Sequence, residues 1–434
     1  MMRRRTASTL LLGLLASCST PKAKIVGTQI PVLPESDALN VAVDAPAVTV
    51  PAAMTLSGWP VAMGNAAHAP GNVAGPTGMT SRWHARIGAA GGYARPLWAS
   101  PVAAGPYVFT MDANGDVHAM GVTDGVQVWR TSTRPKHASE QNIGGGIAFD
   151  SGRIYASTGY AELLALDATD GKIIWRQPLA LPARTAPAIS GGLVAVVVQN
   201  DLLLTFDAQS GTAGWRFVGQ VGDPPAATVA VAGPPAFADG IMVAGFSSGT
   251  LAALDVNSGT PLWEQSLASS FGQASSLDFS DIVAAPVIAN GVVYAVGLGN
   301  TALAIDLHSG AKVWSHAAAS TQAFCLVGDF AYFIDATQTL FAIHADDGLV
   351  SWSLQMPGFN EPKKKEEPIL WAGPVMVNGR LVLVSDYHAV ALVDPVAGTV
   401  ISMGKLAGRA DITPIIAGGL LLQLTRDAVL TAYS

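Results

Sequence analysis

The sequence predicts an all-β fold, an eight-bladed β-propeller built from four-stranded antiparallel blades. Three observations predict it. A motif recurs at intervals of 38 to 51 residues, strand-like runs flank turn signals within each repeat, and each chain end carries part of one unit. No convincing helical period appears after residue 80. We therefore assign residues 80–434 to the propeller.

The repeated motif is a short stretch with fixed spacing, first clear in ALDATDGKIIW at residues 165–175. In all seven copies a Gly stands four residues after the Asp position, which Gly121 and His344 occupy in two copies. Trp follows the Gly by four residues in six copies, and Ser402 is the exception. The other copies are AMGVTDGVQVW (119–129), TFDAQSGTAGW (205–215), ALDVNSGTPLW (253–263), AIDLHSGAKVW (304–314), AIHADDGLVSW (342–352) and LVDPVAGTVIS (392–402).

The motif is interpreted as structural, because a ligand site would occur once and this pattern occurs around the whole ring. We name the four strands of a unit A to D in chain order. The Asp-to-Gly stretch is then the turn between strands C and D, where Asp bonds its own backbone and Gly takes a positive φ. The Trp in strand D is expected to cover the seam with the next blade.

The two ends of the chain predict the blade count. Residues 413–434 supply strands A, B and C of a last unit but no strand D, whereas TSRWHARIG at 80–88 reads as a strand D with no unit of its own. Pairing these ends closes a ring of eight blades, which removes the free sheet edges.

The first residues read as a bacterial lipoprotein signal. Arg3, Arg4 and Arg5 precede a short apolar run, which leads to the lipobox-like LASC. We predict a signal peptide at 1–17, lipidation of Cys18, and a flexible linker and extension at 18–79. Ser19 after the Cys is typical of outer-membrane rather than inner-membrane lipoproteins. The alternative is an ordinary secretory signal in which the Cys is incidental.

Composition and motifs predict no catalytic, cofactor-binding or metal-binding residues. A net charge of −7 argues against nucleic-acid binding, and Cys325 is expected to be a core thiol. GFSSG (245–249) and GLGNTA (297–302) match hydrolase and dinucleotide patterns, but no helix is expected after either. DANGD (112–116) resembles the start of a calcium loop without its later ligands. We interpret all three as turns.

The repeat resembles that of the quinoprotein, or PQQ-type, propellers. Quinone-dependent alcohol dehydrogenases of that group hold their cofactor beneath adjacent cysteines, which this chain lacks. The lipobox, linker, length and WPVAMGNAAH (59–68) resemble instead the BamB family of the outer-membrane β-barrel assembly (BAM) machine. The resemblance implies a non-enzymatic, lipid-anchored periplasmic scaffold that binds the POTRA domains of BamA and other BAM components as a monomer within a hetero-complex. A periplasmic propeller that binds sugars or peptides, and a dehydrogenase, stay as alternatives.

The same resemblance implies a partner-binding patch. Arg184 in LPARTAP and Asp281 in SDIVAAP match the family's Arg and one of its two acidic positions, and Val283 replaces the other. The connections from strand D to the next strand A vary most in length, which marks a binding face. Leu181 and Phe279 are added as apolar contacts. The full set of apolar residues in these connections is Leu179, Leu181, Phe271, Leu277, Phe279, Met356 and Phe359.

Overall fold

The computed structural model describes residues 39–434 except 93–94, 139–140, 220–231, 269–279 and 362. These described residues belong to one compact unit, and every regular element among them is a β-strand. The predicted signal peptide at 1–17 and the lipidation site Cys18 lie outside the described residues. No helix long and apolar enough to traverse a bilayer occurs in the part of the chain that the structure describes.

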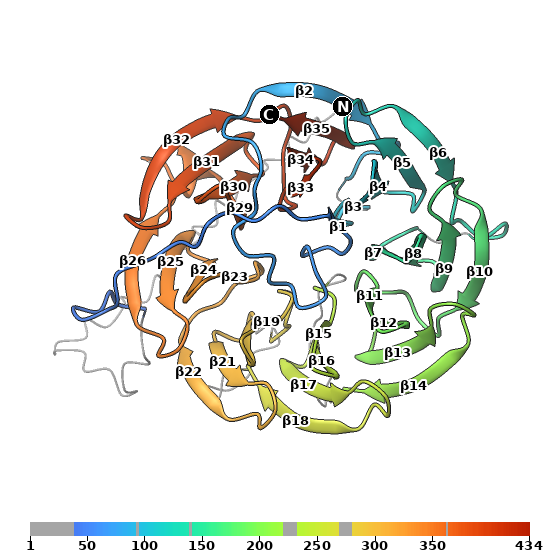
Figure 1. The fold of residues 1–434 in the computed structure, drawn as a ribbon, viewed down its shortest axis with the longest axis horizontal. Helices are drawn as coiled ribbons and strands as arrows, with labels where there is room; N and C mark the ends of the chain where they lie inside the picture. The colour runs from blue at the N-terminus through green and yellow to red at the C-terminus, as the bar shows by residue number, and fades with distance from the viewer. Residues whose placement is uncertain (1–38, 93–94, 139–140, 220–231, 269–279, 362) are drawn as a thin grey trace, which may run out of the picture. The chain divides into compact units, whose positions relative to one another are not determined.

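The strands form eight four-stranded antiparallel blades arranged as a ring, which confirms the predicted fold (Figure 1). Each unit runs from strand A at the centre to strand D at the rim. Blade 1 is β3 (Val102–Ala104), β4 (Tyr107–Met111), β5 (Val117–Gly121) and β6 (Gln127–Thr131). Blade 2 is β7 (Gly145–Asp150), β8 (Arg153–Thr158), β9 (Glu162–Asp167) and β10 (Ile173–Pro178). Blade 3 is β11 (Ala188–Ser190), β12 (Leu193–Val198), β13 (Leu202–Asp207) and β14 (Ala213–Val218).

The later blades follow the same order around the ring. Blade 4 is β15 (Ala236–Ala238), β16 (Ile241–Gly245), β17 (Thr250–Asp255) and β18 (Pro261–Ser266), and blade 5 is β19 (Val287–Ala289), β20 (Val292–Val296), β21 (Ala302–Asp306) and β22 (Lys312–His316). Blade 6 is β23 (Cys325–Val327), β24 (Phe330–Ile334), β25 (Thr339–His344) and β26 (Val350–Gln355). Blade 7 is β29 (Trp371–Val377), β30 (Arg380–Ser385), β31 (Ala389–Asp394) and β32 (Thr399–Lys405).

Blade 8 joins the two ends of the propeller, as predicted. Its strands are β33 (Ile415–Ala417), β34 (Leu420–Leu424), β35 (Val429–Tyr433) and, at the rim, β2 (Ser81–Arg86). Strand β2 pairs antiparallel with β35, so that Trp83 lies opposite Ala432. The backbones of Thr80 and Ser434 exchange two hydrogen bonds, of 3.2 and 2.9 Å, beyond the paired strands. The ring is therefore closed by strand pairing alone.

The repeated Trp and Gly lock neighbouring blades together, which confirms the structural interpretation of the motif. Trp263 Nε1 donates to Leu307 O in the next blade's C–D turn over 2.8 Å. Its ring covers Gly310, where φ is +70° and an added Cβ would come within 2.6 Å of the indole. Only Gly fits under the ring at this backbone angle. Trp83, Trp129, Trp175, Trp215, Trp314 and Trp352 make the equivalent hydrogen bond.

The repeat's exception, Ser402, has a physical reason. It lies on β32 of blade 7, whose neighbour is blade 8. In blade 8 the place of a C–D turn is taken by the junction of Ser434 and Thr80, so no turn glycine is present for a Trp to cover. The seam that the chain ends create is the one that lacks the Trp lock.

Residues 58–78 cross the middle of the ring along the inner strands (Figure 1). Strand β1 (Gly58–Trp59) adds a fifth strand to blade 1 by pairing with β3. Beyond it, Pro60 O accepts from Phe149 N of blade 2, and Ala66 O and Ala67 O accept from Phe237 N and Ile288 N of blades 4 and 5, all within 2.8 Å. Further along, Val73 bridges to Val377 of blade 7. This crossing segment therefore contacts blades on every side of the ring.

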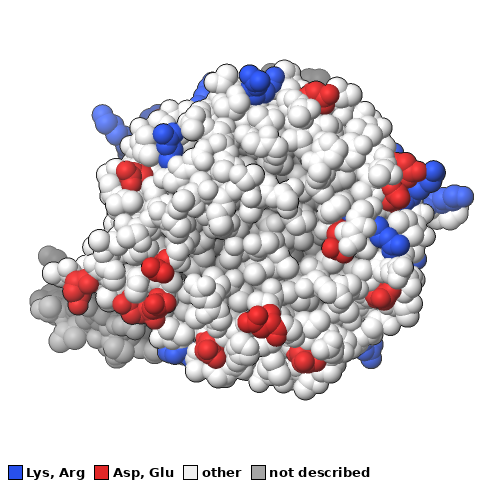
Figure 2. All heavy atoms as spheres, viewed as in Figure 1, with Lys and Arg blue, Asp and Glu red and all other residues white. Residues whose placement is uncertain are grey.

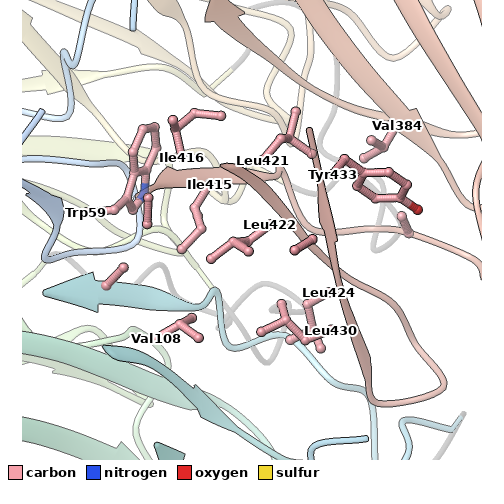
Figure 3. Close-up of a cluster of buried hydrophobic side chains, with 14 of the residues drawn as sticks. Trp59, Val108, Val384, Ile415, Ile416, Leu421, Leu422, Leu424, Leu430 and Tyr433 are labelled. Carbon is pink, nitrogen blue, oxygen red and sulfur yellow. The ribbon is translucent and has the colours of Figure 1, made fainter. Parts of the chain in front are cut away.

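The crossing segment is anchored by buried side chains. Trp59 is 2% exposed and packs with Ile415 and Ile416 of blade 8 in one hydrophobic cluster (Figure 3). His68 is also 2% exposed, and its Nδ1 lies 2.7 Å from Pro286 O of blade 5. Burial lowers the pKa of His68 to about 4, so the ring is neutral at pH 7 and its Nδ1–H donates to that carbonyl.

The structure differs from the predicted flexible linker for residues 39–58. Ala42 N donates to Val350 O of blade 6 over 2.9 Å, and Ser351 Oγ donates to Pro46 O over 3.1 Å. Val48 is buried in the core cluster shared by blades 6 and 7. The absence of a helical or alternating pattern led to the linker interpretation. An extended chain that lies on existing blades needs no periodicity of its own.

Candidate functional site

The propeller has two different faces, which we name by what they carry. The turn face carries the A–B and C–D turns, which touch one another, as where Ala168 N donates to Gly152 O. The connection face carries the B–C turns and the D–A connections, as where Gln199 N donates to Pro182 O. The crossing segment lies on the turn face, because it contacts the strand A residues next to the A–B turns. The predicted binding loops therefore lie on the opposite face.

The turn face is largely uncharged at its centre. Figure 2 shows this face with its acidic and basic side chains towards the rim and none over the middle. The crossing segment from residue 58 to 78 carries no Asp, Glu, Lys or Arg. A pocket of about 410 Å³ lies between blades 1 and 2 on this face, where Ser57 and Gly58 meet Tyr107, Phe109 and Phe149. Its lining residues include no Asp, Glu, Lys, Arg or His.

On the connection face the structure brings Arg184 and Asp281 together. Arg184 Nη2 lies 2.7 Å from Asp281 Oδ1, and Arg184 Nη1 lies 3.2 Å from Asp201 Oδ1. The three side chains are at most 1% exposed. The proximity of Arg184 and Asp281 agrees with the sequence-based patch, but their exposure does not. Both side chains are directed into the protein, so neither presents its charge to a partner.

Asp201, which sequence analysis did not single out, is the centre of this buried network. It lies in the B–C turn of blade 3, where Asn200 and Asp201 both have positive φ. Besides Arg184, its carboxylate accepts hydrogen bonds from Ser247 N at 2.9 Å, Ser247 Oγ at 2.7 Å and Ser248 N at 3.1 Å. It thus joins the B–C turns of blades 3 and 4. The sequence signal was an Asn-Asp pair between two apolar strands, which also fits a plain turn.

Backbone hydrogen bonds continue the network across three consecutive D–A connections. Ala232 N donates to Arg184 O over 3.1 Å, and Gly233 N donates to Val283 O over 2.7 Å. Asp281 O in turn accepts from Leu298 N of the B–C turn of blade 5. The Arg184–Asp201–Asp281 cluster therefore fixes the connections of blades 2 to 5 relative to one another. The cluster thus holds the loops of this face in a fixed arrangement.

The predicted apolar contacts divide into two groups. Leu179 and Met356 are buried at 4% and 1% exposure and belong to the core, so they are not available on the surface. Leu181 is half-buried and packs beside Ala183. Phe359 begins a hairpin that the sequence did not predict, formed by β27 (Phe359–Glu361) and β28 (Glu366–Pro368). Phe279, Phe271 and Leu277 lie outside the described residues.

The three accidental motifs are turns, as predicted. GFSSG leads into β17 and GLGNTA into β21, so neither is followed by a helix. In DANGD, Asp112 Oδ1 accepts from Asn114 N and Asp116 N, and its Oδ2 accepts from Ala89 N at 2.8 Å. Its carboxylate serves the turn rather than a cation. Among the described residues no group of three or more His, Cys, Asp or Glu side chains is placed to hold a metal ion.

The ring has eight blades, and a Trp–Gly contact locks seven of its seams. With the chain's own N-terminal segment across the middle of one face, these features define a β-propeller of the PQQ-like repeat class with a rigid loop surface. The family model described as "Outer membrane protein assembly factor BamB" matches residues 80–354, and the chain belongs to this family. BamB of Yersinia pestis is 26% identical over 368 residues, covering 82% of this chain and 88% of that protein. The Escherichia coli K12 protein is 26% identical over 361 residues, with the same coverage.

Solved structures support the fold. BamB of Moraxella catarrhalis aligns with a TM-score of 0.68 at 19% identity, covering 82% of this chain and all of that one. Quinohemoprotein alcohol dehydrogenase of Comamonas testosteroni aligns with a TM-score of 0.66 at 13% identity, covering 86% of this chain and 77% of the enzyme. At these identities the similarity establishes the architecture alone.

Proposed function

We propose that this protein is a non-enzymatic scaffold for the assembly of outer-membrane proteins, and that it binds the POTRA domains of BamA together with other BAM components. The observation that carries the proposal is the sequence relationship to assembly factors named BamB, which spans 82% of the chain and 88% of the relatives. The solved BamB of Moraxella catarrhalis has the same ring fold, which agrees with the proposal.

A role as a quinone-dependent dehydrogenase is less well supported, although those enzymes share the fold. The chain holds two cysteines, Cys18 and Cys325, which cannot be adjacent. Cys325 is 8% exposed, and burial raises the pKa of its thiol to about 12, so it has little thiolate character at pH 7. The buried carboxylates of Asp201 and Asp281 on the connection face are engaged by Arg184, and that of Asp201 also by backbone amides.

We propose the connection face around blades 2 to 5 as the partner-binding surface. The Arg184–Asp281 pair acts there by holding the connections in place, while Leu181 and the exposed Ala180 beside it contact the partner, and Phe279 is kept as a candidate contact. Apolar groups presented by a rigid frame lose little conformational entropy on binding.

The lipid anchor belongs to the same proposal. Cys18, acylated after removal of residues 1–17, would hold the propeller at the periplasmic face of the outer membrane. Several acyl chains make a stable anchor, because each buried CH₂ contributes about 0.8 kcal/mol. Intact-mass analysis of the mature chain tests this, and an N-terminus other than acylated Cys18 contradicts it.

The partner is tested by affinity purification from detergent-solubilised membranes. The wild-type chain should recover BamA, and Ala180→Arg should recover at least fivefold less, because the long side chain disturbs the proposed contact. Ala213→Arg is the matched control, since Ala213 is exposed on β14 at the rim. Recovery of no BAM component by the wild-type chain would overturn the function. Equal recovery by both variants would move the surface elsewhere.

A further inference from the structure

The charge of the chain is divided unevenly around the ring. Residues 80–219, which form blades 1 to 3 and the closing strand β2, carry eleven Lys and Arg and ten Asp and Glu. Residues 220–434, which form the rest of the ring, carry eight and eighteen. A protein of net charge −7 thus has one nearly neutral sector beside a strongly acidic one. An acidic partner would be repelled by most of the ring and accepted only at that sector.

Within that sector, four basic residues gather on the connection face around the B–C turn of blade 1. We call Arg95, Arg130, Arg134 and Lys136 the basic patch. Arg95 Nη1 donates to Asn114 Oδ1 of that turn, and Arg130 lies 2.5 Å from Asp116 of the same turn. Arg134 follows Thr133, whose hydroxyl donates to Gly115 O over 2.8 Å. Arg95 and Arg130 are thereby tied to this five-residue turn, Arg134 follows a residue that is, and Lys136 lies two residues further along the same connection.

Tyr160 shows that the patch is compact. Its hydroxyl donates to Asn114 O over 2.9 Å. Burial raises the pKa of Tyr160. The charges of Arg134 and Arg95 act to lower it and those of Asp116 and Asp112 act to raise it, so the two guanidinium groups and two buried carboxylates all act on one phenol. The patch therefore spans little more than one turn and the connections on each side of it.

Among the described residues, three of the four cations of the patch have no carboxylate partner. Asp116 neutralises Arg130, whose side chain is 53% exposed. Arg134 Nη2 donates to the backbone carbonyl of Ala138 over 2.8 Å, and Arg95 donates to an amide oxygen, so both keep their charge. No carboxylate among the described residues forms an ion pair with Arg95, Arg134 or Lys136, and all three are exposed. Three solvent-exposed cations remain.

We propose that the basic patch is a docking site for an acidic segment of a partner protein. The inference rests on the proposed scaffold function and adds a second contact to it, on blade 1 rather than on blades 2 to 5. Arginine matches carboxylates through its planar fork, and the bonds to Asn114 and Ala138 pre-orient both guanidinium groups. An acidic polypeptide is favoured over an anionic lipid surface, because the pairing of Arg130 with Asp116 leaves three free cations, fewer than the four to eight Lys or Arg of typical lipid-binding clusters.

The test uses the full-length protein and a fluorescein-labelled dodecaglutamate peptide, followed by fluorescence anisotropy. The wild type should bind at 20 mM NaCl and weaken severalfold at 150 mM, as expected for exposed charges. The triple variant R95E/R134E/K136E should lose at least tenfold in affinity while its melting temperature stays within a few degrees of the parent's.

The matched control is K363E/K364E/K365E, which makes the same change of charge in the exposed tip between β27 and β28, on the connection face of the acidic sector. It should change the affinity by less than twofold. An equal loss in both triple variants would overturn the proposal, since net charge alone would then explain binding, as would a wild type that binds no peptide. Vesicles containing phosphatidylglycerol form the second arm. The proposal would be overturned if the protein bound these vesicles through the patch but did not bind dodecaglutamate, because the patch would then be a lipid-binding site.

The proposed function and this inference are tested by independent experiments, so that one can be contradicted without the other. Recovery of BamA by the wild-type chain tests the scaffold role without reference to the patch, whereas dodecaglutamate tests the patch without BamA. If both hold, the patch variant should recover less BamA than the hairpin variant does. Equal recovery by the two would show that the patch serves no contact with that complex, and would overturn the proposal as a second contact of the scaffold.

Discussion

Arg184 and Asp281 are 97 residues apart in the sequence, yet Nη2 of one lies 2.7 Å from Oδ1 of the other inside the protein. They stand in D–A connections two blades apart, and each has almost no exposed surface. The sequence predicted that Arg184 would be exposed to a partner. In the structure Arg184 is buried and joins the loops of that face. We therefore expect a substitution at Arg184 to change stability first, and binding by these loops only through it.

Replacing Arg184 by Met should lower the free energy of unfolding by about 3–5 kcal/mol, because two buried carboxylates, those of Asp201 and Asp281, lose their shared partner. Chemical denaturation measures it. Arg216→Met is the control: Arg216 is exposed on β14 and forms no ion pair among the described residues, so its replacement should stay within about 0.5 kcal/mol. If the two variants lose equal stability, the buried network does not stabilise the fold.

Trp263→Ala should lower the free energy of unfolding by about 3–5 kcal/mol, the range for a buried large aromatic residue. The indole is 8% exposed and locks blade 4 to blade 5 through Leu307 and Gly310. Trp98, which is 44% exposed, provides the control substitution to Ala. Hydrogen exchange should locate the lost protection at that seam. Uniform loss over all blades would argue against a local lock.

Deleting Ala428–Ser434 should abolish cooperative thermal unfolding near the parent's melting temperature. The deletion removes β35, which buries Leu430, Ala432 and Tyr433 and pairs with both β34 and β2. Circular dichroism during heating measures the transition. A truncated chain that melts like the parent would show that the ring does not depend on this closure.

His68 gives the fold a specific dependence on pH. Its pKa is about 4 in the folded protein against 6.5 ordinarily, so the unfolded chain takes up the proton first as the pH falls. The stability that the neutral ring contributes is therefore complete above about pH 6.5 and is lost progressively between 6.5 and 4, by about 3 kcal/mol in all.

His68→Asn isolates this contribution. Asn keeps an N–H donor for Pro286 O and tolerates the φ of +62° at this position, but it does not titrate. Denaturation of both proteins from pH 7.5 to 4 should show a wild type that loses more stability than the variant over that window. Parallel curves would mean that His68 is protonated equally well in both states.

Almost all of the structure that could be predicted from the sequence was predicted from the repeat. The spacing of Asp, Gly and Trp predicted blades, seams and the partner of β2, because each blade solves the same packing problem with the same residues. The crossing segment at 58–78 was not predictable in this way. Many of its contacts, such as Pro60 with Phe149 or Ala67 with Ile288, are backbone hydrogen bonds to other blades, and these require no particular side chain. Its buried side chains, Trp59 and His68, belong to no repeat.

The structure locates Arg184 and Asp281 on the connection face, and their burial was not predicted. The sequence placed Arg184 and Asp281 on one face through loop lengths and family resemblance, and the structure joins them. The sequence did not reveal the role of Asp201, because its local pattern is that of an ordinary turn residue. Its carboxylate accepts hydrogen bonds from Arg184 and from the B–C turn of blade 4. Burial of a charge is decided by neighbours distant in sequence, so no local pattern announces it.

Closure by β2 and β35 also sets an order in time. A chain is synthesised from its N-terminus, so β2 exists before any blade, and its partner β35 is the last strand to be made. Until synthesis is complete, the edge of β2 that pairs with β35 in the folded protein has no native partner. Arg82, His84 and Arg86 alternate along it and are exposed in the finished protein. Charged side chains on a waiting edge discourage pairing with other chains. Strand β2 is thus suited to remain unpaired until β35 has been synthesised.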